Sequence, residues 1–137
     1  MRVVLDTNVL ISACLKPDGL EAEMVRMAVD GTILACITEE VLNEYREVLL
    51  RDKFQGVRGR AEAILGDLER RALVVVSGVR VAAAKDEDDN RLLECAEAAR
   101  AEYLVTGNLR DYPDEWAGTR VVNARSFYEA NNAGKGA

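Results

Sequence analysis

The chain has no histidine among its 137 residues, and this absence narrows the chemistry open to it. Serine–histidine and cysteine–histidine hydrolases, histidine-based metal centres and histidine acid–base catalysis are all excluded. Any catalytic group must therefore be a carboxylate, or the side chain of a lysine, tyrosine, serine, threonine or cysteine.

Cysteine and long apolar runs are also scarce. The three cysteines, Cys14, Cys36 and Cys95, are odd in number and far apart, which predicts buried thiols in a reducing compartment rather than disulfides or a zinc site. No apolar run approaches the length needed to cross a membrane. Asp6 interrupts the N-terminal segment too early for the core of a signal peptide. We therefore expect a cytoplasmic protein with no membrane partner.

Aromatic residues make up only 5% of the chain, but 49% of it is hydrophobic, so alanine, valine and leucine must build the core. This length predicts one domain, which we place at residues 1–130. Residues 131–137 are polar and glycine-rich and are expected to form a disordered tail. The net charge of −6 argues against nucleic-acid binding when taken alone, because phosphate contacts usually rest on lysine and arginine.

Short apolar runs alternate with longer segments of helical periodicity. The expected strands are residues 2–5, 33–37, 73–76, 103–106 and 120–122. The expected helices are residues 8–15, 21–30, 39–51, 58–71, 88–100 and 126–131. Alternation of this kind, with almost wholly apolar strands, predicts an α/β fold with a central parallel sheet of four to five strands. Ligands of such sheets bind beyond the carboxyl ends of the strands.

Two acids follow apolar strands. Asp6 directly follows the first strand, so its carboxylate is expected at the functional edge of the sheet; the alternative is a helix cap. After the fourth strand come Thr106, Gly107, Asn108 and, three residues later, Asp111. These residues are a second set of oxygen ligands beyond a strand end, although asparagine and aspartate are also common in ordinary turns.

Two further acids lie on helices at positions that face the core. Glu44 lies past the first turn of its helix, on the flank of an apolar stripe, and has no basic partner one turn away. Asp89 falls inside the apolar stripe of its helix, where a charge is costly to bury unless a cation or strong donors meet it. The alternatives are a solvated glutamate at position 44 and, at position 89, part of a capping arrangement with Asp86.

The four acids, although distant in the sequence, could converge on one edge of the sheet. Carboxylates that cluster repel one another, and each must take up a proton or find a cation. Hard oxygen ligands without histidine or cysteine favour Mg²⁺ or Mn²⁺ over zinc. Arg46, Lys53, Arg91 and Arg110 are candidates for holding phosphates, but for each of them solvated surface charge is the stronger interpretation.

Four segments resemble, in order and spacing, the four motifs of the PIN domain family. The resemblance covers the chain from residue 2 to about 127 and depends on VVLDTNVLISA (3–13), TEEVLNEYREVL (38–49), DNRLLECA (89–96) and LVTGNLRDY (104–112). Within the family the chain is most similar to the branch described as toxin components of toxin–antitoxin systems, the VapC-like ribonucleases.

The resemblance implies a three-layer α/β/α sandwich and a ribonuclease that uses Mg²⁺ or Mn²⁺. It implies Asp6, Glu44, Asp89 and Asp111 as catalytic and metal-binding residues, and it implies that the nearby Asn8, Thr106 and Asn108 support them. An RNA substrate, an antitoxin protein and a second copy of the chain are the implied partners. Related sequences often carry an acid where this chain has Asn108. The asparagine would therefore weaken the fourth ligand here, and Asp111 would take that role.

Three other functions have some support from the sequence. A haloacid-dehalogenase-type phosphotransferase also begins with an aspartate after its first strand, but it needs a second aspartate where this chain has Asn8. A response-regulator receiver groups acids around Mg²⁺, but Lys85 and Lys135 are poorly placed for its lysine. An inactive PIN-like interaction module is the third alternative, and acids at all four motif positions argue against it.

Overall fold

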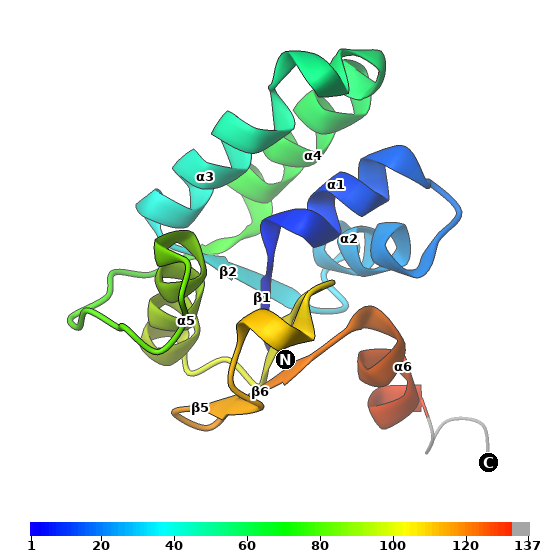
Figure 1. Cartoon of the computed structure of the whole chain (residues 1–137). Coiled ribbons are helices and arrows are strands. Elements are labelled where there is room, and N and C mark those ends of the chain that lie inside the picture. Colours follow the sequence, from blue (N-terminus) through cyan, green and yellow to red (C-terminus); the bar gives the residue numbers. More distant parts are fainter. Residues whose placement is uncertain (133–137) are drawn as a thin grey trace.

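The computed structural model describes residues 1–132. Five parallel strands and one antiparallel strand form a single sheet in the order β3-β2-β1-β4-β6-β5 (Figure 1). The strands are β1 (Arg2–Leu5), β2 (Leu34–Ile37), β3 (Leu73–Val74), β4 (Tyr103–Val105), β5 (Glu115–Trp116) and β6 (Thr119–Val122). The helices are α1 (Thr7–Leu15), α2 (Leu20–Asp30), α3 (Glu39–Leu49), α4 (Arg58–Arg71), α5 (Glu87–Ala99) and α6 (Ala124–Asn132), with 3₁₀ turns η1 (Asp52–Val57) and η2 (Leu109–Asp111).

The expected α/β architecture is confirmed, but the expected strand number is wrong. The sheet has six strands instead of four to five, because β5 pairs antiparallel with β6 at one edge. Ala117 and Gly118, both with positive φ, make the tight turn that connects these two strands. Strand β5 consists of Glu115 and Trp116 and lies outside any apolar run, and this is why it was not predicted.

Helices cover both faces of the sheet. Helix α5 packs against β1, β2 and β4 on one face. Helices α1, α2 and α4 pack against one another on the other face, where α6 packs against α2 and β4. Helices α3 and α4 run side by side away from the sheet (Figure 1). This separation follows from right-handed crossovers, because the connections to β2 and β3 run one way along the sheet and α5 returns the other way.

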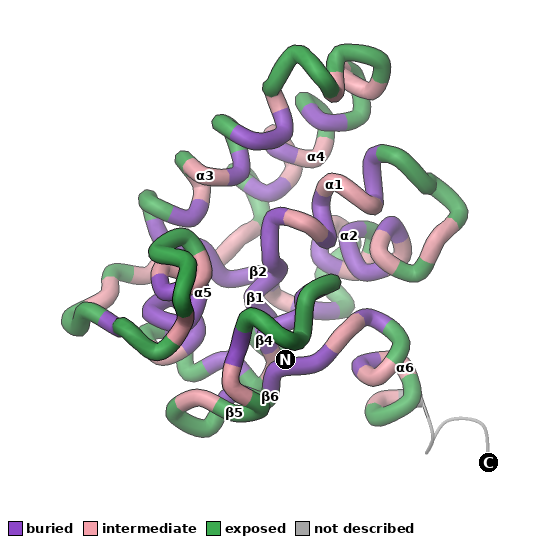
Figure 2. The backbone as a smooth tube through the Cα atoms, viewed as in Figure 1, coloured by how far each residue is buried: buried purple, intermediate pink, exposed green. Residues whose placement is uncertain are grey.

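The strands at the centre of the sheet are buried on both faces. Consecutive residues of β1, Val3, Val4 and Leu5, are at most 1% exposed, so neither face of that strand meets water (Figure 2). Burial of side chains of this size contributes about 1.5–3 kcal/mol each. The three cysteines are free and buried in the same core, as predicted.

Side-chain caps fix the start of the two helices that carry candidate acids. The Thr38 hydroxyl accepts the Val41 N–H at 3.1 Å at the start of α3, and the Asp86 carboxylate accepts the Asp88 N–H at 2.9 Å at the start of α5. At the C-terminus, α6 runs to Asn132, two residues into the expected tail. The rest of that tail lies outside the described residues. None of the helices in the described part of the chain has the length and apolar character that crossing a bilayer requires.

Candidate metal-dependent active site

Asp6 lies at the carboxyl edge of the sheet, next to Thr106. Strands β1 and β4 pair in parallel with Leu5 opposite Val105, so the residues that follow them are neighbours. Asp6 is 5% exposed, and the Thr106 hydroxyl donates to its Oδ2 at 2.8 Å. The Asp6 side chain makes no capping hydrogen bond to α1, although it occupies the cap position. The helix-cap alternative therefore does not describe this carboxylate.

Asn8 fastens the loop after β4 to the start of α1. Its Oδ1 accepts the Gly107 N–H at 2.8 Å, and its Nδ2 lies 3.3 Å from Asp6 Oδ2. A Cβ at position 107 would lie only 3.3 Å from Asn8 Oδ1, so glycine allows the close approach. Asn108 contributes through its backbone, because its N–H donates to the Thr106 hydroxyl at 3.0 Å. These contacts hold Thr106 and Asp6 in one orientation.

Asp89 reaches the same edge from α5, and Tyr112 links it to Asp6. The Tyr112 hydroxyl lies 2.8 Å from Asp6 Oδ2 and 2.9 Å from Asp89 Oδ1, and Tyr112 is 8% exposed. The sequence analysis did not predict this contact of Tyr112 with both carboxylates. The structure therefore brings Asp6 and Asp89 together around a single hydroxyl group.

Glu44 and Asp111 lie in two separate cavities, neither of which is lined by Asp6 or Asp89. Glu44 is half-buried in a cavity that it shares with Thr7 and Asp88. Asp111 is exposed on η2, beside Asn108 and Asn123. Within residues 1–132, no three acidic side chains lie close enough to enclose one ion. Of the four predicted acids, the structure thus joins Asp6 and Asp89 through Tyr112, and it does not join Glu44 or Asp111 to them.

Comparison with known proteins places this arrangement in a family. A family model of the PIN domain matches residues 2–110. The chain belongs to the PIN domain family. A curated relative of this PIN domain, the uncharacterized protein MJ1680 of Methanocaldococcus jannaschii, is 26% identical over 111 residues, which are 79% of this chain and 71% of the relative.

Two solved structures resemble this PIN domain in fold. One is VapBC2 from Rickettsia felis bound to a DNA fragment from its promoter, with a TM-score of 0.59, 16% identity, and coverage of 90% of this chain and 98% of that chain. The other is FitAB bound to an IR36 DNA fragment, with a TM-score of 0.55, 19% identity, and coverage of 89% and 94%. Both likenesses support the fold. The family match also removes the haloacid-dehalogenase and receiver alternatives.

Burial raises the pKa values of Asp6, Asp89 and Glu44 in the PIN domain's candidate site. Burial raises the pKa of Asp6, and hydrogen bonds from Thr106 and Tyr112 offset part of this effect. Burial, aided by the nearby Asp6 charge, raises the pKa of Asp89 to about 6. Burial and the charge of Asp88 raise the pKa of Glu44 to about 7. The site therefore holds negative charge at a cost that a cation would relieve.

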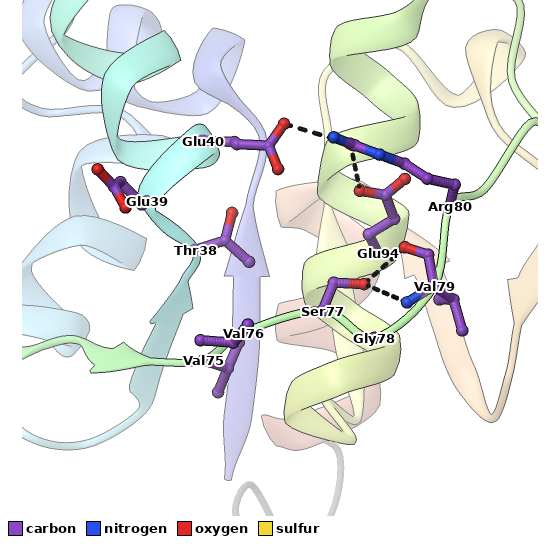
Figure 3. A pocket seen from close by; sticks show the side chains of 10 residues that line it. All are labelled: Thr38, Glu39, Glu40, Val75, Val76, Ser77, Gly78, Val79, Arg80 and Glu94. Carbon is purple, nitrogen blue, oxygen red and sulfur yellow. Dashed lines mark hydrogen bonds and ion pairs between the residues drawn. The ribbon is translucent and has the colours of Figure 1, made fainter.

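Glu94 is a buried acid that the sequence did not single out. It is 2% exposed on α5, where its Oε2 accepts the Val81 N–H at 2.9 Å and lies 2.7 Å from Arg91. Figure 3 shows Arg80 reaching both Glu94 and Glu40 across the cavity formed with the segment after β3. Glu94 thus fastens the segment that leads into α5, and so supports the helix that carries Asp89.

Proposed function

We propose that this PIN domain is a ribonuclease that depends on Mg²⁺ or Mn²⁺ and hydrolyses RNA phosphodiester bonds. The observation that carries the proposal is the meeting of Asp6 and Asp89 at the carboxyl edge of the sheet, at 2.8 and 2.9 Å from one hydroxyl group. The donor set fits a hard divalent cation, because both groups are carboxylates and no histidine or cysteine thiolate competes. Burial raises the pKa of both carboxyl groups, so a positive charge beside them would be favourable.

In this proposal Asp6 and Asp89 would hold the ion, and Glu44 and Asp111 are assigned to the site by their motif positions. The ion would supply a lowered pKa for the attacking water and would offset charge that develops on the phosphate. Thr106 and Asn8 keep the Asp6 carboxylate oriented through their hydrogen bonds. Glu44, with a pKa of about 7, is suited to accept a proton near neutral pH.

The test is cleavage of labelled RNA and single-stranded DNA with Mg²⁺, with Mn²⁺ or with EDTA. We expect the wild type to cleave RNA with either metal and to be inactive in EDTA. Asp6→Asn and Asp89→Asn should each slow cleavage by about 100-fold or more. Asp18→Asn, which neutralises an exposed acid in the α1–α2 connection, is the matched control and should cleave as the wild type does. Folded Asp6 and Asp89 variants with wild-type rates would refute the proposed site.

The biological role we propose is that of the toxin in a toxin–antitoxin pair. Two observations support it: the resemblance of the four motifs to VapC-like sequences, and the fold shared with VapBC2 and FitAB, which are toxin–antitoxin systems. Induced expression of the wild type should arrest growth, and Asp89→Asn should not. The implied homodimer is tested by light scattering of the purified protein. Growth that continues with active, soluble wild-type enzyme present would contradict the toxin role.

A further inference from the structure

A cavity of about 450 Å³ lies beyond the carboxyl ends of β4 and β6, at the edge where ligands of parallel sheets bind. It is formed by the segment that follows β4 and by the residue that follows β6. Asp111 lines this cavity, and the next residue, Tyr112, contacts both Asp6 and Asp89. A strand of RNA that passes over the acid pair could therefore place a neighbouring nucleotide in the cavity.

Side chains with unused hydrogen-bonding groups line the cavity. Arg110 and Asn108 are exposed, and within residues 1–132 neither side chain makes a hydrogen bond or an ion pair. Asn123 Oδ1 accepts the Ser126 N–H at 2.8 Å at the start of α6, whereas its Nδ2 donates to no group in the described part of the chain. The cavity thus offers a guanidinium and two side-chain amides to a ligand.

An apolar side chain completes the lining. Leu109 is 42% exposed and is one of the few large apolar side chains in residues 1–132 that are open to water. A guanidinium binds a phosphate or stacks on a base, amides bind the edge of a base, and an apolar side chain packs against its face. This combination suits an unpaired nucleotide, and the cavity volume lies within the usual range for ligand sites, about 300–1,000 Å³.

We propose that this cavity is a subsite for one nucleotide of the RNA strand, next to the phosphodiester bond that is cleaved. Arg110 binds a phosphate of that nucleotide, and the amides of Asn108 and Asn123 bind its base. This inference rests on the proposed function. Asp111 also lines the cavity and repels phosphate, and the ion to which its motif position assigns it would offset that repulsion.

The first measurement is the fluorescence anisotropy of labelled single-stranded RNA in Mg²⁺, with every protein carrying the slow-cleaving Asp89→Asn change. Adding Arg110→Gln should weaken RNA binding about fivefold at low salt. It should also reduce the slope of log affinity against log salt by about 0.7, because one phosphate contact is lost. Arg71→Gln is the matched control and should leave binding unchanged, because Arg71 is exposed at the end of α4, before the amino end of β3.

The second measurement is the steady-state kinetics of RNA cleavage by the full chain in Mg²⁺. Asn123→Ser keeps a side-chain oxygen that can accept the Ser126 N–H, so α6 retains its start, and it removes only the amide donors. We expect this variant and Arg110→Gln each to raise KM about threefold or more, with kcat within about twofold of the wild type. Such a result separates substrate binding from the chemical step.

The other outcomes separate this inference from the proposed function. Unchanged RNA affinity and unchanged KM in both variants would overturn the subsite, and so would a fall in kcat with KM unchanged. In either case RNA cleavage by the wild type would leave the proposed function standing. A wild type that neither binds nor cleaves RNA would overturn both.

Discussion

Replacing Asp89 with asparagine should make the metal-free protein more stable at neutral pH while it removes a proposed metal ligand. Burial raises the pKa of Asp89 from 3.8 to about 6, so the ionised carboxylate is unfavourable in the folded state. A shift of this size corresponds to about 3 kcal/mol at 1.36 kcal/mol per pKa unit. Solvent screening reduces this value. The variant also loses the favourable interaction of the Asp89 charge with the N-terminus of α5, which lowers its gain in stability by about 0.3–1 kcal/mol. We therefore expect a gain of about 1–2 kcal/mol in the free energy of unfolding.

The sign of the pH dependence follows from the direction of the shift. Because the folded pKa of Asp89 lies above its ordinary value of 3.8, the folded state binds more protons than the unfolded state between pH 3.8 and about 6. Stability from this group is fully present below pH 3.8 and is lost as the pH rises through about 6. Asparagine does not titrate. The difference in the free energy of unfolding between the variant and the wild type should therefore grow between pH 3.8 and about 6 and stay constant at higher pH.

The assay is urea unfolding in EDTA at pH 4.5, 5.5 and 7.5 for the wild type, Asp89→Asn and the exposed-site control Asp18→Asn. The asparagine oxygen can still accept the Tyr112 hydroxyl, so the variant keeps the packing of the site. The control should follow the wild type at every pH. The reasoning that burial makes this charge unfavourable would be refuted if the stability of Asp89→Asn changed with pH as that of the wild type does. It would also be refuted if the variant were less stable than the wild type at pH 7.5.

Three other variants test the remaining contacts. Glu44→Gln should be more stable than the wild type at pH 8, with the difference shrinking toward pH 5, because the pKa of Glu44 is raised to about 7; thermal unfolding in EDTA measures this. Thr106→Val removes the hydroxyl that donates to Asp6 and should cost about 1–3 kcal/mol in urea unfolding; equal stability would contradict that contact. Glu94→Gln should cost about 3 kcal/mol, because it leaves the Arg91 charge without its buried partner, and amide exchange at residue 81 should rise in the same variant.

The fold was predictable where the sequence pattern is local. Strand β1 and helix α4 were predicted with the bounds that the structure shows, because a run of buried apolar residues and a long helical period each fix their own limits. The position of Asp6 followed as well, because a residue after a parallel strand must lie at the carboxyl edge of the sheet. Asp89 was recognised from its place within an apolar stripe.

The contacts within the site were not predictable, because each one joins elements that are distant in the chain. The hydroxyl of Tyr112 reaches Asp6 and Asp89 only because η2 returns over the ends of β1 and α5. A tyrosine in a loop carries no sign of such a role. Glu94 was missed for a related reason: its partners in the segment before α5 have no regular periodicity, so nothing in the sequence marks them as its neighbours.

The acidic charge of the chain and a phosphate-bearing substrate can be reconciled from the contacts of the basic residues. Arg46 is paired with Glu69, and Arg91 is paired with Glu94, so neither charge is available to a phosphate without breaking an ion pair. Arg110 is exposed on η2 beside Asp111, and within residues 1–132 it has no ion-pair partner. In the proposed function, Arg110 and the charge of the proposed ion would therefore both attract an RNA phosphate to this edge. Without the ion, the acids would repel the substrate.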